Sequence, residues 1–212
     1  PTSSPRIGGQ GGRILMLVTE PHANLDTIVS EAVAGGVDIV QWRDKSAGGS
    51  ALPSTLRQAA WPARVIANAL GEIAVRLGVD GRHLPESCPE TVAETRRALC
   101  KNALVGRSAH CLETAVAAEC EGADYVVAGT IFASRSHPDL PPAGLDFLRA
   151  VCQAVRIPVI AIGGILPENV ADCLDAGAAG VAVLSPIMLA DNPRAAAAAY
   201  RAALDEAAGK KH

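Results

Sequence analysis

The chain has 212 residues, of which 49% are hydrophobic, 19% charged and 3% aromatic. This composition is typical of one globular domain and excludes a disordered tail and a collagen-like repeat. The formal charge is -3 and the 19 basic residues are scattered along the chain, which argues against a nucleic-acid partner.

The first segment, Pro1 to Gly12, is rich in glycine, serine and proline and lacks the charged-then-apolar order of a signal peptide. We expect residues 1–12 to form a flexible arm and residues 13–208 to form one domain. The six cysteines contain no C-x-x-C pair, so neither a zinc site nor a disulfide framework is expected. Reduced thiols indicate a cytoplasmic protein.

Short apolar runs follow in chain order and predict eight buried strands. They are Ile14 to Val18, Ile39 to Trp42, Arg64 to Ala67, Gly81 to Leu84, Ala103 to Gly106, Tyr125 to Ala128, Val159 to Ile162 and Gly180 to Leu184. The segments between them predict helices. These are Leu25 to Ala34, Glu90 to Leu99, Leu112 to Glu121, Leu145 to Val155, Glu168 to Ala176 and Pro193 to Ala207.

A repeated helix exit marks every second strand. At Val37, Val79, Ala123 and Ala178 an amphipathic segment has just ended at a glycine and an apolar run begins. Strict alternation of apolar strands with helices predicts a parallel sheet covered by helices, and eight units in about 200 residues fit a single-domain α/β fold, the (β/α)₈ TIM barrel. An open doubly wound sheet is the alternative, because alternation does not show closure.

The longest uncharged apolar run, Ala176 to Ala190, has 15 residues. A membrane span needs roughly 20, so no membrane partner is expected.

In a barrel of this kind the functional residues follow the strands, at the C-terminal rim. Gln41, Arg43 and Lys45 alternate with Trp42 and Asp44 at the second strand, so they should point together into the barrel mouth. Two cations and an amide suit an anionic or heteroaromatic group of a substrate. The alternative is a solvated salt bridge on the rim.

Further polar residues lie at or after the third, fifth and sixth strands. The candidate substrate ligands among them are Asn68, Ser108, Thr130, Ser134 and Ser136. For Asn68, capping a helix that starts near Gly71 is an equally good interpretation.

Two turns predict a phosphate-binding cup. The seventh strand ends in Gly163-Gly164 and the eighth in Leu184-Ser185. Adjacent glycines let the backbone approach an anion and aim its N–H groups at it, and barrels of this kind bind phosphate after these two strands. The alternative is a glycine pair needed only for tight packing.

Histidine is the natural proton carrier near neutral pH. His137, in a Ser/Arg-rich loop after the sixth strand, is the first candidate for an acid or base, against a role as a mobile surface residue. His110 is the second candidate. His110 and His83 are also suited to structural hydrogen bonds.

Several segments, in one order and spacing, carry a family resemblance. They are Val40 to Lys45, Asn68, Asp80 to Leu84, Gly106 to His110, Gly122 to Tyr125, Gly129 to Phe132, Pro158 to Ile165 and Gly177 to Val183. Together they resemble the thiamine phosphate synthase and TenI superfamily. The resemblance implies a (β/α)₈ barrel that binds thiazole phosphate and, in the synthases, hydroxymethylpyrimidine diphosphate with Mg²⁺. It also implies a homodimer.

The resemblance also implies two aspartates that hold Mg²⁺ in the synthases, one directly after Asn68 and one in the loop after the fourth strand. This chain has Ala69 and the segment His83 to Cys88 there, which leaves Glu86 as the one carboxylate. Mg²⁺ is held through one or two carboxylates and substrate phosphates. We therefore expect no cofactor, and Mg²⁺ only if the chain is a synthase.

Two segments, His83 to Pro85 and Leu140 to Leu145, resemble the TenI branch, which includes thiazole tautomerases. These shift a proton to aromatise thiazole carboxylate phosphate and need no metal. The first interpretation is a tautomerase in which His137 or His110 serves as acid or base, because Thr130 stands where the resemblance implies a histidine. The alternatives are thiamine phosphate synthase, with Glu86 and substrate phosphates holding the metal, and a non-catalytic thiazole-phosphate binding protein.

Overall fold

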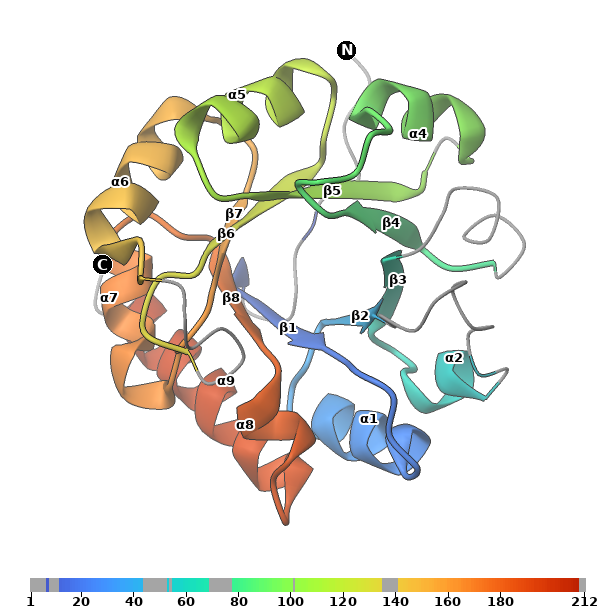
Figure 1. Ribbon diagram of the computed structural model, residues 1–212. Helices are drawn as coiled ribbons and strands as arrows, with labels where there is room; N and C mark the ends of the chain where they lie inside the picture. Colours follow the sequence, from blue (N-terminus) through green and yellow to red (C-terminus); the bar gives the residue numbers. More distant parts are fainter. Residues whose placement is uncertain are drawn as a thin grey trace.

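The computed structural model describes Ile7, residues 12–43, Pro53, and residues 55–68, 78–100, 102–134 and 141–209. Within these residues eight parallel strands close into a barrel, each strand beside its neighbours in the sequence and β1 beside β8. Figure 1 shows the ring of strands with the helices outside it. The predicted (β/α)₈ barrel is confirmed, and the open sheet is wrong.

The strands agree closely with the predicted runs. They are β1 (Ile14–Val18), β2 (Ile39–Arg43), β3 (Arg64–Asn68), β4 (Gly81–Leu84), β5 (Leu104–Ala109), β6 (Tyr125–Gly129), β7 (Val159–Ile162) and β8 (Gly180–Val183). The main difference is β5, which continues beyond Gly106 to Ala109. Ser108 is therefore a strand residue, and the direction of its side chain is fixed by the pleat.

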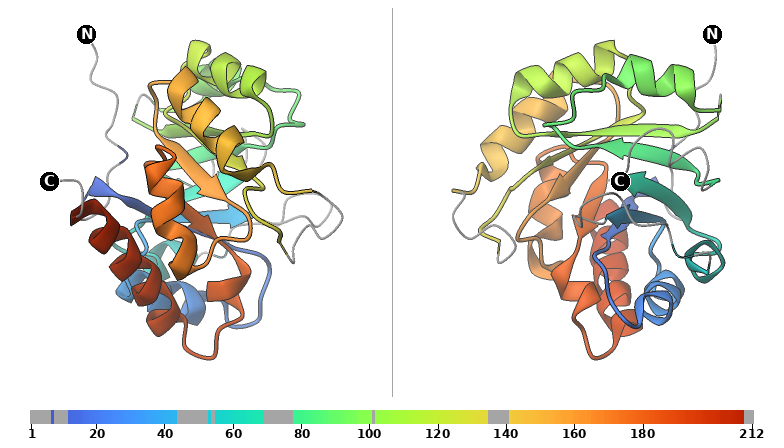
Figure 2. Two further views of the ribbon diagram at one scale, coloured as in Figure 1. Left: turned by 90° about the vertical axis from the view of Figure 1, so that its left-hand side faces the viewer. Right: turned by 45° about the vertical axis from the view of Figure 1, so that its right-hand side comes forward.

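The helices cover the outside of the barrel. They are α1 (Leu25–Ala34), α2 (Leu56–Ala59), α4 (Val92–Ala98), α5 (Leu112–Cys120), α6 (Gly144–Ala154), α7 (Val170–Asp175) after the 3₁₀ turn η2 (Pro167–Asn169), α8 (Ser185–Met188) and α9 (Pro193–Gly209). Figure 2 shows α9 lying against α1 and α7, where it completes the helical layer. The short helix α8 was not predicted.

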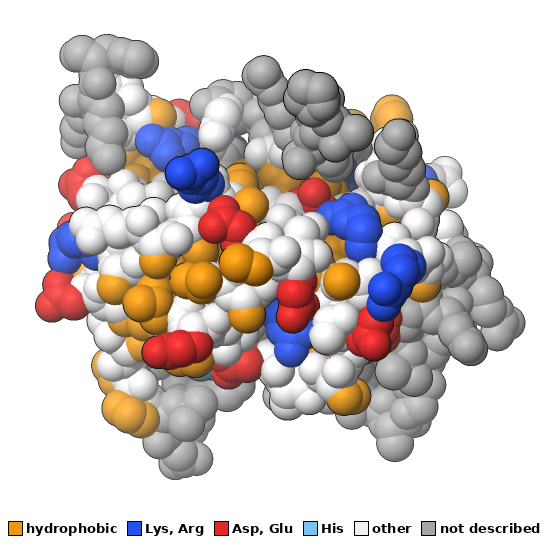
Figure 3. Space-filling model, turned by 90° about the horizontal axis from the view of Figure 1, so that it is seen from above, with side chains coloured by type: hydrophobic (Ala, Val, Ile, Leu, Met, Phe, Trp, Pro, Cys, Tyr) orange, Lys and Arg blue, Asp and Glu red, His pale blue; other side chains and the backbone are white. Residues whose placement is uncertain are grey.

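None of the helices within the described ranges is both long and apolar enough to cross a membrane. On the face above α4 and α5, acidic and basic side chains are interspersed between apolar ones (Figure 3).

Buried apolar side chains form two layers. The inner layer fills the barrel and consists of Ile14, Met16, Val18, Ile39, Ile66, Leu104, Tyr125, Val127, Ile160 and Ala182. Residues of opposite parity on the same strands, such as Leu15, Val40 and Trp42, pack outward against the helices. The pleat therefore decides which side chains can reach the mouth.

At the repeated helix exits, hydrogen bonds link the N-terminal ends of neighbouring strands; we call each such set of hydrogen bonds a clasp. Asp38, Asp80 and Asp124 each precede an even-numbered strand, and each donates its backbone N–H to the odd-numbered strand before it. The three carboxylates accept backbone N–H groups of those same strands at 2.8, 2.8 and 2.7 Å. In the fourth repeat Ala179 keeps the backbone bond without a carboxylate.

Each of the three carboxylates also pairs with an arginine from a covering helix. Arg201 of α9 reaches Asp38, and Arg96 of α4 reaches Asp124. Arg57 of α2 lies 3.5 Å from Asp80, and these two side chains are 53% and 35% exposed. The side chains of Arg96 and Asp124 are only 28% and 6% exposed. The clasp at Asp124 is therefore the more deeply buried of these two.

We expect Asp124→Ala to lower the free energy of unfolding by about 3 kcal/mol, because it leaves the Val105 N–H and the Arg96 guanidinium without their buried acceptor. Arg57→Ala removes an exposed partner and should cost less than about 1 kcal/mol. Urea unfolding of both variants checks this. Equal losses would show that the buried carboxylate of Asp124 contributes no more to stability than the exposed guanidinium of Arg57.

Candidate functional site

The C-terminal rim carries a guanidinium and two amides on adjacent strands. Arg43 and Asn68 are register partners at the ends of β2 and β3. Gln41 and Arg43 share strand parity with Ile39 of the inner layer, whereas Trp42 packs outward. The predicted inward direction of Gln41 and Arg43 is thus confirmed.

Arg43 is half-buried, and burial lowers the pKa of its guanidinium while the carboxylate of Glu20 opposes that shift. Arginine still keeps its charge at any physiological pH. The predicted third member of this set, Lys45, lies outside the described residues.

A polar network crosses the barrel interior just below the rim. His83 on β4 is buried, with Nδ1 3.2 Å from the Tyr125 hydroxyl and Nε2 2.9 Å from Ser108 Oγ. The His83 and Tyr125 rings stack with centroids 5.7 Å apart and planes 27° apart. Ser108, a predicted substrate ligand, is partly exposed and forms the upper end of this network.

The buried imidazole of His83 is held in its neutral form. Burial lowers the pKa of His83 to about 3, and the charges of Arg107 and Arg43 add to this shift. The imidazole is therefore neutral at physiological pH and is a poor proton acceptor. The guanidinium of Arg43, at the end of β2, favours an anionic ligand at the rim.

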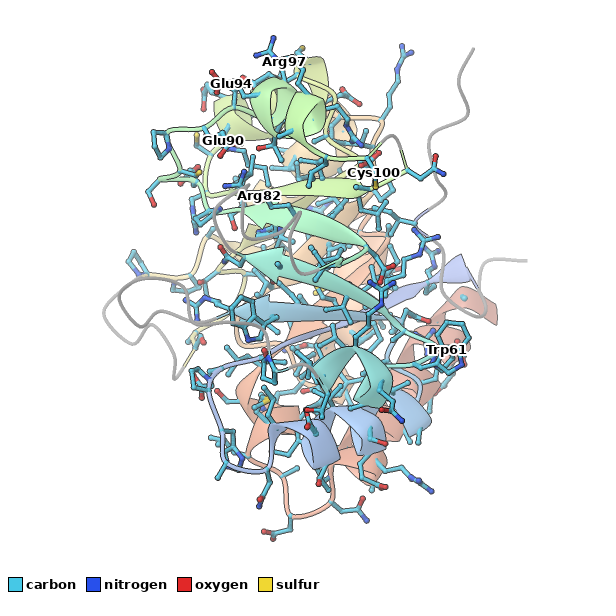
Figure 4. The ribbon with its side chains drawn as sticks, turned by 90° about the vertical axis from the view of Figure 1, so that its right-hand side faces the viewer. Trp61, Arg82, Glu90, Glu94, Arg97 and Cys100 are labelled. Atoms are coloured by element: carbon cyan, nitrogen blue, oxygen red, sulfur yellow. The ribbon has the colours of Figure 1, made fainter. Side chains whose placement is uncertain are left out.

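The loop between β4 and α4 is held by two arginines. Arg82 points outward from β4 and is buried, with Nη1 2.6 Å from Glu90 Oε2 (Figure 4). Arg107 of β5 donates to the carbonyls of Glu86, Cys88 and Glu90 at 2.9 to 3.0 Å. This fixes the path of the loop beside the mouth.

The fixed loop brings Glu86 to His110. The carboxylate of Glu86 accepts the His110 backbone N–H at 3.0 Å and lies 2.5 Å from His110 Nδ1. The His110 side chain is 56% exposed. These hydrogen bonds lower the pKa of Glu86 against the opposing effect of burial.

The described residues do not fit a Mg²⁺ site. Both oxygens of Glu86 are taken by His110, and the segment His83 to Cys88 has no aspartate where the family resemblance implies one. Within the described ranges no three His, Cys, Asp or Glu side chains gather closely enough to hold a metal ion. We therefore assign no chemical step to a metal.

The two predicted phosphate turns lie at the same rim. Gly163 and Gly164 have φ of 98° and 63°, which side chains rarely adopt, and a Cβ on either would overlap the segment from Thr130 to Ala133. Tight packing therefore requires both glycines, as the alternative interpretation held. Ser185 begins α8, so the turn after β8 leads into a short extra helix, as in phosphate-binding barrels. Phosphate binding stays a prediction.

The segment after β6 carries the remaining candidates. Thr130 accepts the Ala143 backbone N–H through its carbonyl at 2.8 Å, and its side chain borders the space at Gly163. Ser134 is partly buried. Ser136 and His137, the first candidate for an acid or base, lie outside the described residues.

Sequence reasoning missed Tyr125 and Gly106 and gave His83 only a secondary role. Strand parity contains the signal, because His83 falls two residues after Gly81 and Tyr125 begins a strand whose next inward residue is Val127. A tyrosine among inward apolar residues needs a polar partner inside the barrel.

Comparison with known proteins agrees with this geometry. A family model described as thiamine monophosphate synthase matches residues 15–187. The chain is similar to the thiamine-phosphate synthase of Chloroflexus aurantiacus, at 41% identity over 183 residues, 82% of this chain and 83% of that protein. The same-named protein of Anaeromyxobacter dehalogenans is 43% identical over 179 residues, 82% of this chain and 80% of that protein.

Among solved structures, thiamine phosphate pyrophosphorylase from Pyrococcus furiosus superposes with a TM-score of 0.79 at 30% identity. The match covers 93% of this chain and 98% of that one.

Proposed function

This chain belongs to the thiamine monophosphate synthase family, and we propose that it is itself a thiamine phosphate synthase, which joins hydroxymethylpyrimidine diphosphate to thiazole phosphate. The relatives named thiamine-phosphate synthase favour this activity over the tautomerase that the TenI-like motifs first suggested. The observation that supports the proposal is the C-terminal rim, where Arg43 and Asn68 are register partners at the ends of β2 and β3 and Ser108 lies on β5 of the same barrel.

The proposed reaction needs two anion sites. A C–N bond forms between the thiazole ring nitrogen and the methylene carbon of the pyrimidine, and the C–O bond to diphosphate breaks with its electron pair leaving on the diphosphate. In this proposal Arg43 and the Ser108 hydroxyl hold the leaving diphosphate, whose charge grows as the bond breaks. The turns at Gly163-Gly164 and Leu184-Ser185 would hold the phosphate of the thiazole.

The test is formation of thiamine phosphate from the two substrates, with Mg²⁺ present and with EDTA. Product formation by the wild type and a loss of about 100-fold in kcat/KM for Arg43→Gln are expected, because a charged hydrogen-bond donor to the diphosphate disappears. No product from protein that binds thiazole phosphate would exclude the synthase.

Metal dependence gives a separate prediction. Diphosphate oxygens can coordinate Mg²⁺ when the substrate binds. Both carboxylate oxygens of Glu86 are instead hydrogen-bonded to His110. The Mg²⁺ concentration that gives half-maximal activity should therefore be the same in Glu86→Gln and in the wild type. A shift to higher Mg²⁺ in the variant would make Glu86 a metal ligand.

The tautomerase remains a second candidate because both aspartates that the synthase resemblance implies are absent, one at Ala69 and one in the segment His83 to Cys88. Its test is conversion of thiazole carboxylate phosphate to the aromatic isomer, without metal. Loss of turnover in His137→Asn with retained phosphate affinity would support it, and unchanged turnover would remove His137 from the mechanism.

A further inference from the structure

We propose that Tyr125 and His83 are positioning residues that turn the hydroxyl proton of Ser108 toward the barrel mouth, so that Ser108 donates a hydrogen bond to an anionic oxygen of the bound substrate. Given the proposed function, on which this identification of the ligand rests, that oxygen belongs to the diphosphate. The relay itself follows from the barrel interior alone.

The relay spans three strands because one of them carries glycine. His83, Gly106 and Tyr125 are successive register partners on β4, β5 and β6. The Tyr125 ring fills the space that a Cβ on Gly106 would occupy, and it thereby reaches across β5 to stack on His83. Ser108 lies two residues further along β5, on the same inward face, at 2.9 Å from His83 Nε2.

Both ring groups keep their neutral forms. His83 and Tyr125 are fully buried. Burial lowers the pKa of His83 to about 3 and raises that of the Tyr125 hydroxyl, with Arg107 and Arg43 adding to the first shift and Asp124 to the second. The network therefore contains one phenol proton and one imidazole N–H at neutral pH.

Hydrogen-bond satisfaction then selects the tautomer. If Nδ1 of His83 carried the proton, it would donate to the Tyr125 oxygen, and the phenol proton would have no acceptor within the described residues. An unsatisfied buried donor costs about 1 to 3 kcal/mol. If Nε2 carries the proton, Tyr125 donates to Nδ1 and Nε2–H donates to Ser108 Oγ, so each group is satisfied.

The consequence lies at Ser108. Because its oxygen accepts from His83, its own proton is free to point away from His83, into the mouth, where an anionic oxygen can accept it. With the opposite tautomer Ser108 would donate to His83 and present lone pairs to an anion, which is repulsive. The buried tyrosine thus makes a rim serine a donor.

The first test is nitrogen NMR of the substrate-free protein with ¹⁵N-labelled histidine at pH 7, with His83→Gln to assign the His83 signals. The Nε2–H tautomer is expected. Tyr125→Phe keeps the ring over Gly106 but removes the phenol proton, so the tautomer should change or become mixed.

Tyr200→Phe is the matched control for this variant. It also removes a buried hydroxyl, one that donates to the Ile165 carbonyl, and it should leave the His83 tautomer unchanged. An Nδ1–H or charged His83 in the wild type would overturn the relay.

The second test is a double-mutant cycle read by binding of inorganic pyrophosphate. Ser108→Ala should weaken binding about tenfold and Tyr125→Phe about three- to tenfold, since a hydrogen bond to a charged group is lost or misdirected. The double variant should bind no more weakly than Ser108→Ala, because Tyr125 acts through Ser108. Losses that multiply would overturn the relay. Unchanged binding in Ser108→Ala would also overturn it, whereas absence of thiamine phosphate formation would overturn only the proposed function.

Discussion

Gly106→Ala is expected to lower the free energy of unfolding by about 3 kcal/mol and, given the proposed function, to abolish thiamine phosphate formation. A Cβ at this position would overlap the Tyr125 ring, which is buried in the barrel and cannot move toward solvent. Overpacking of a closed core costs about 1 to 3 kcal/mol, and displacing the ring also separates it from His83. Urea unfolding and the synthase assay measure the two effects.

Gly209→Ala is the matched control for this variant. Gly209 ends α9, and a Cβ there has no neighbour within 4 Å among the described residues. Its stability should stay within about 0.5 kcal/mol of the wild type. If Gly106→Ala were as stable as this control, the Tyr125 ring would not lie over β5.

Stability is expected to fall between pH 6.5 and pH 4.5, and His83 should account for most of that fall. Its pKa is about 3 in the folded protein and 6.5 in an unfolded chain. Because the folded-state pKa is the lower one, the stabilisation is fully present above pH 6.5 and is lost as the unfolded chain binds the proton. The slope is about 1.4 kcal/mol per pH unit, or roughly 2 to 3 kcal/mol over this window.

The window is chosen to separate His83 from the carboxylates. Burial raises the pKa of Glu86, but the hydrogen bonds that it accepts, chiefly from His110, together outweigh burial and lower the pKa. The hydrogen bond from Arg82 lowers the pKa of Glu90. Their stabilisation is lost only as pH falls below their ordinary value of 4.5. His83→Gln should therefore show a flatter profile between pH 6.5 and 4.5 in urea unfolding. The same slope in both proteins would show that His83 titrates normally.

The barrel could be predicted because its determinants are local. Apolar runs such as Ile14–Val18 and Val159–Ile162 end where the structure ends them, and the recurring exits at Val37, Val79, Ala123 and Ala178 mark every second strand. Strand parity also placed Gln41 and Arg43 correctly on the inward face. These inferences need only periodicity and turn chemistry.

The interior network could not be predicted because it depends on closure. His83 is hydrogen-bonded to Ser108, 25 residues further along the chain, and to Tyr125, 42 residues further along. Only the register of β4, β5 and β6 brings them together, and register is a tertiary property. The same holds for Glu86, which the synthase alternative made a metal ligand and which instead binds His110.

The aspartates Asp38, Asp80 and Asp124 place polar anchors of the barrel at the end opposite the mouth. These anchors are therefore spatially separate from the rim on the same strands. Substitutions in the rim loops can change what the mouth binds without loosening the anchors that keep the strands in register. Such a molecule is well suited to evolutionary divergence, in which the rim loops change and new ligands bind while the hydrogen bonds at the N-terminal ends of the strands stay the same.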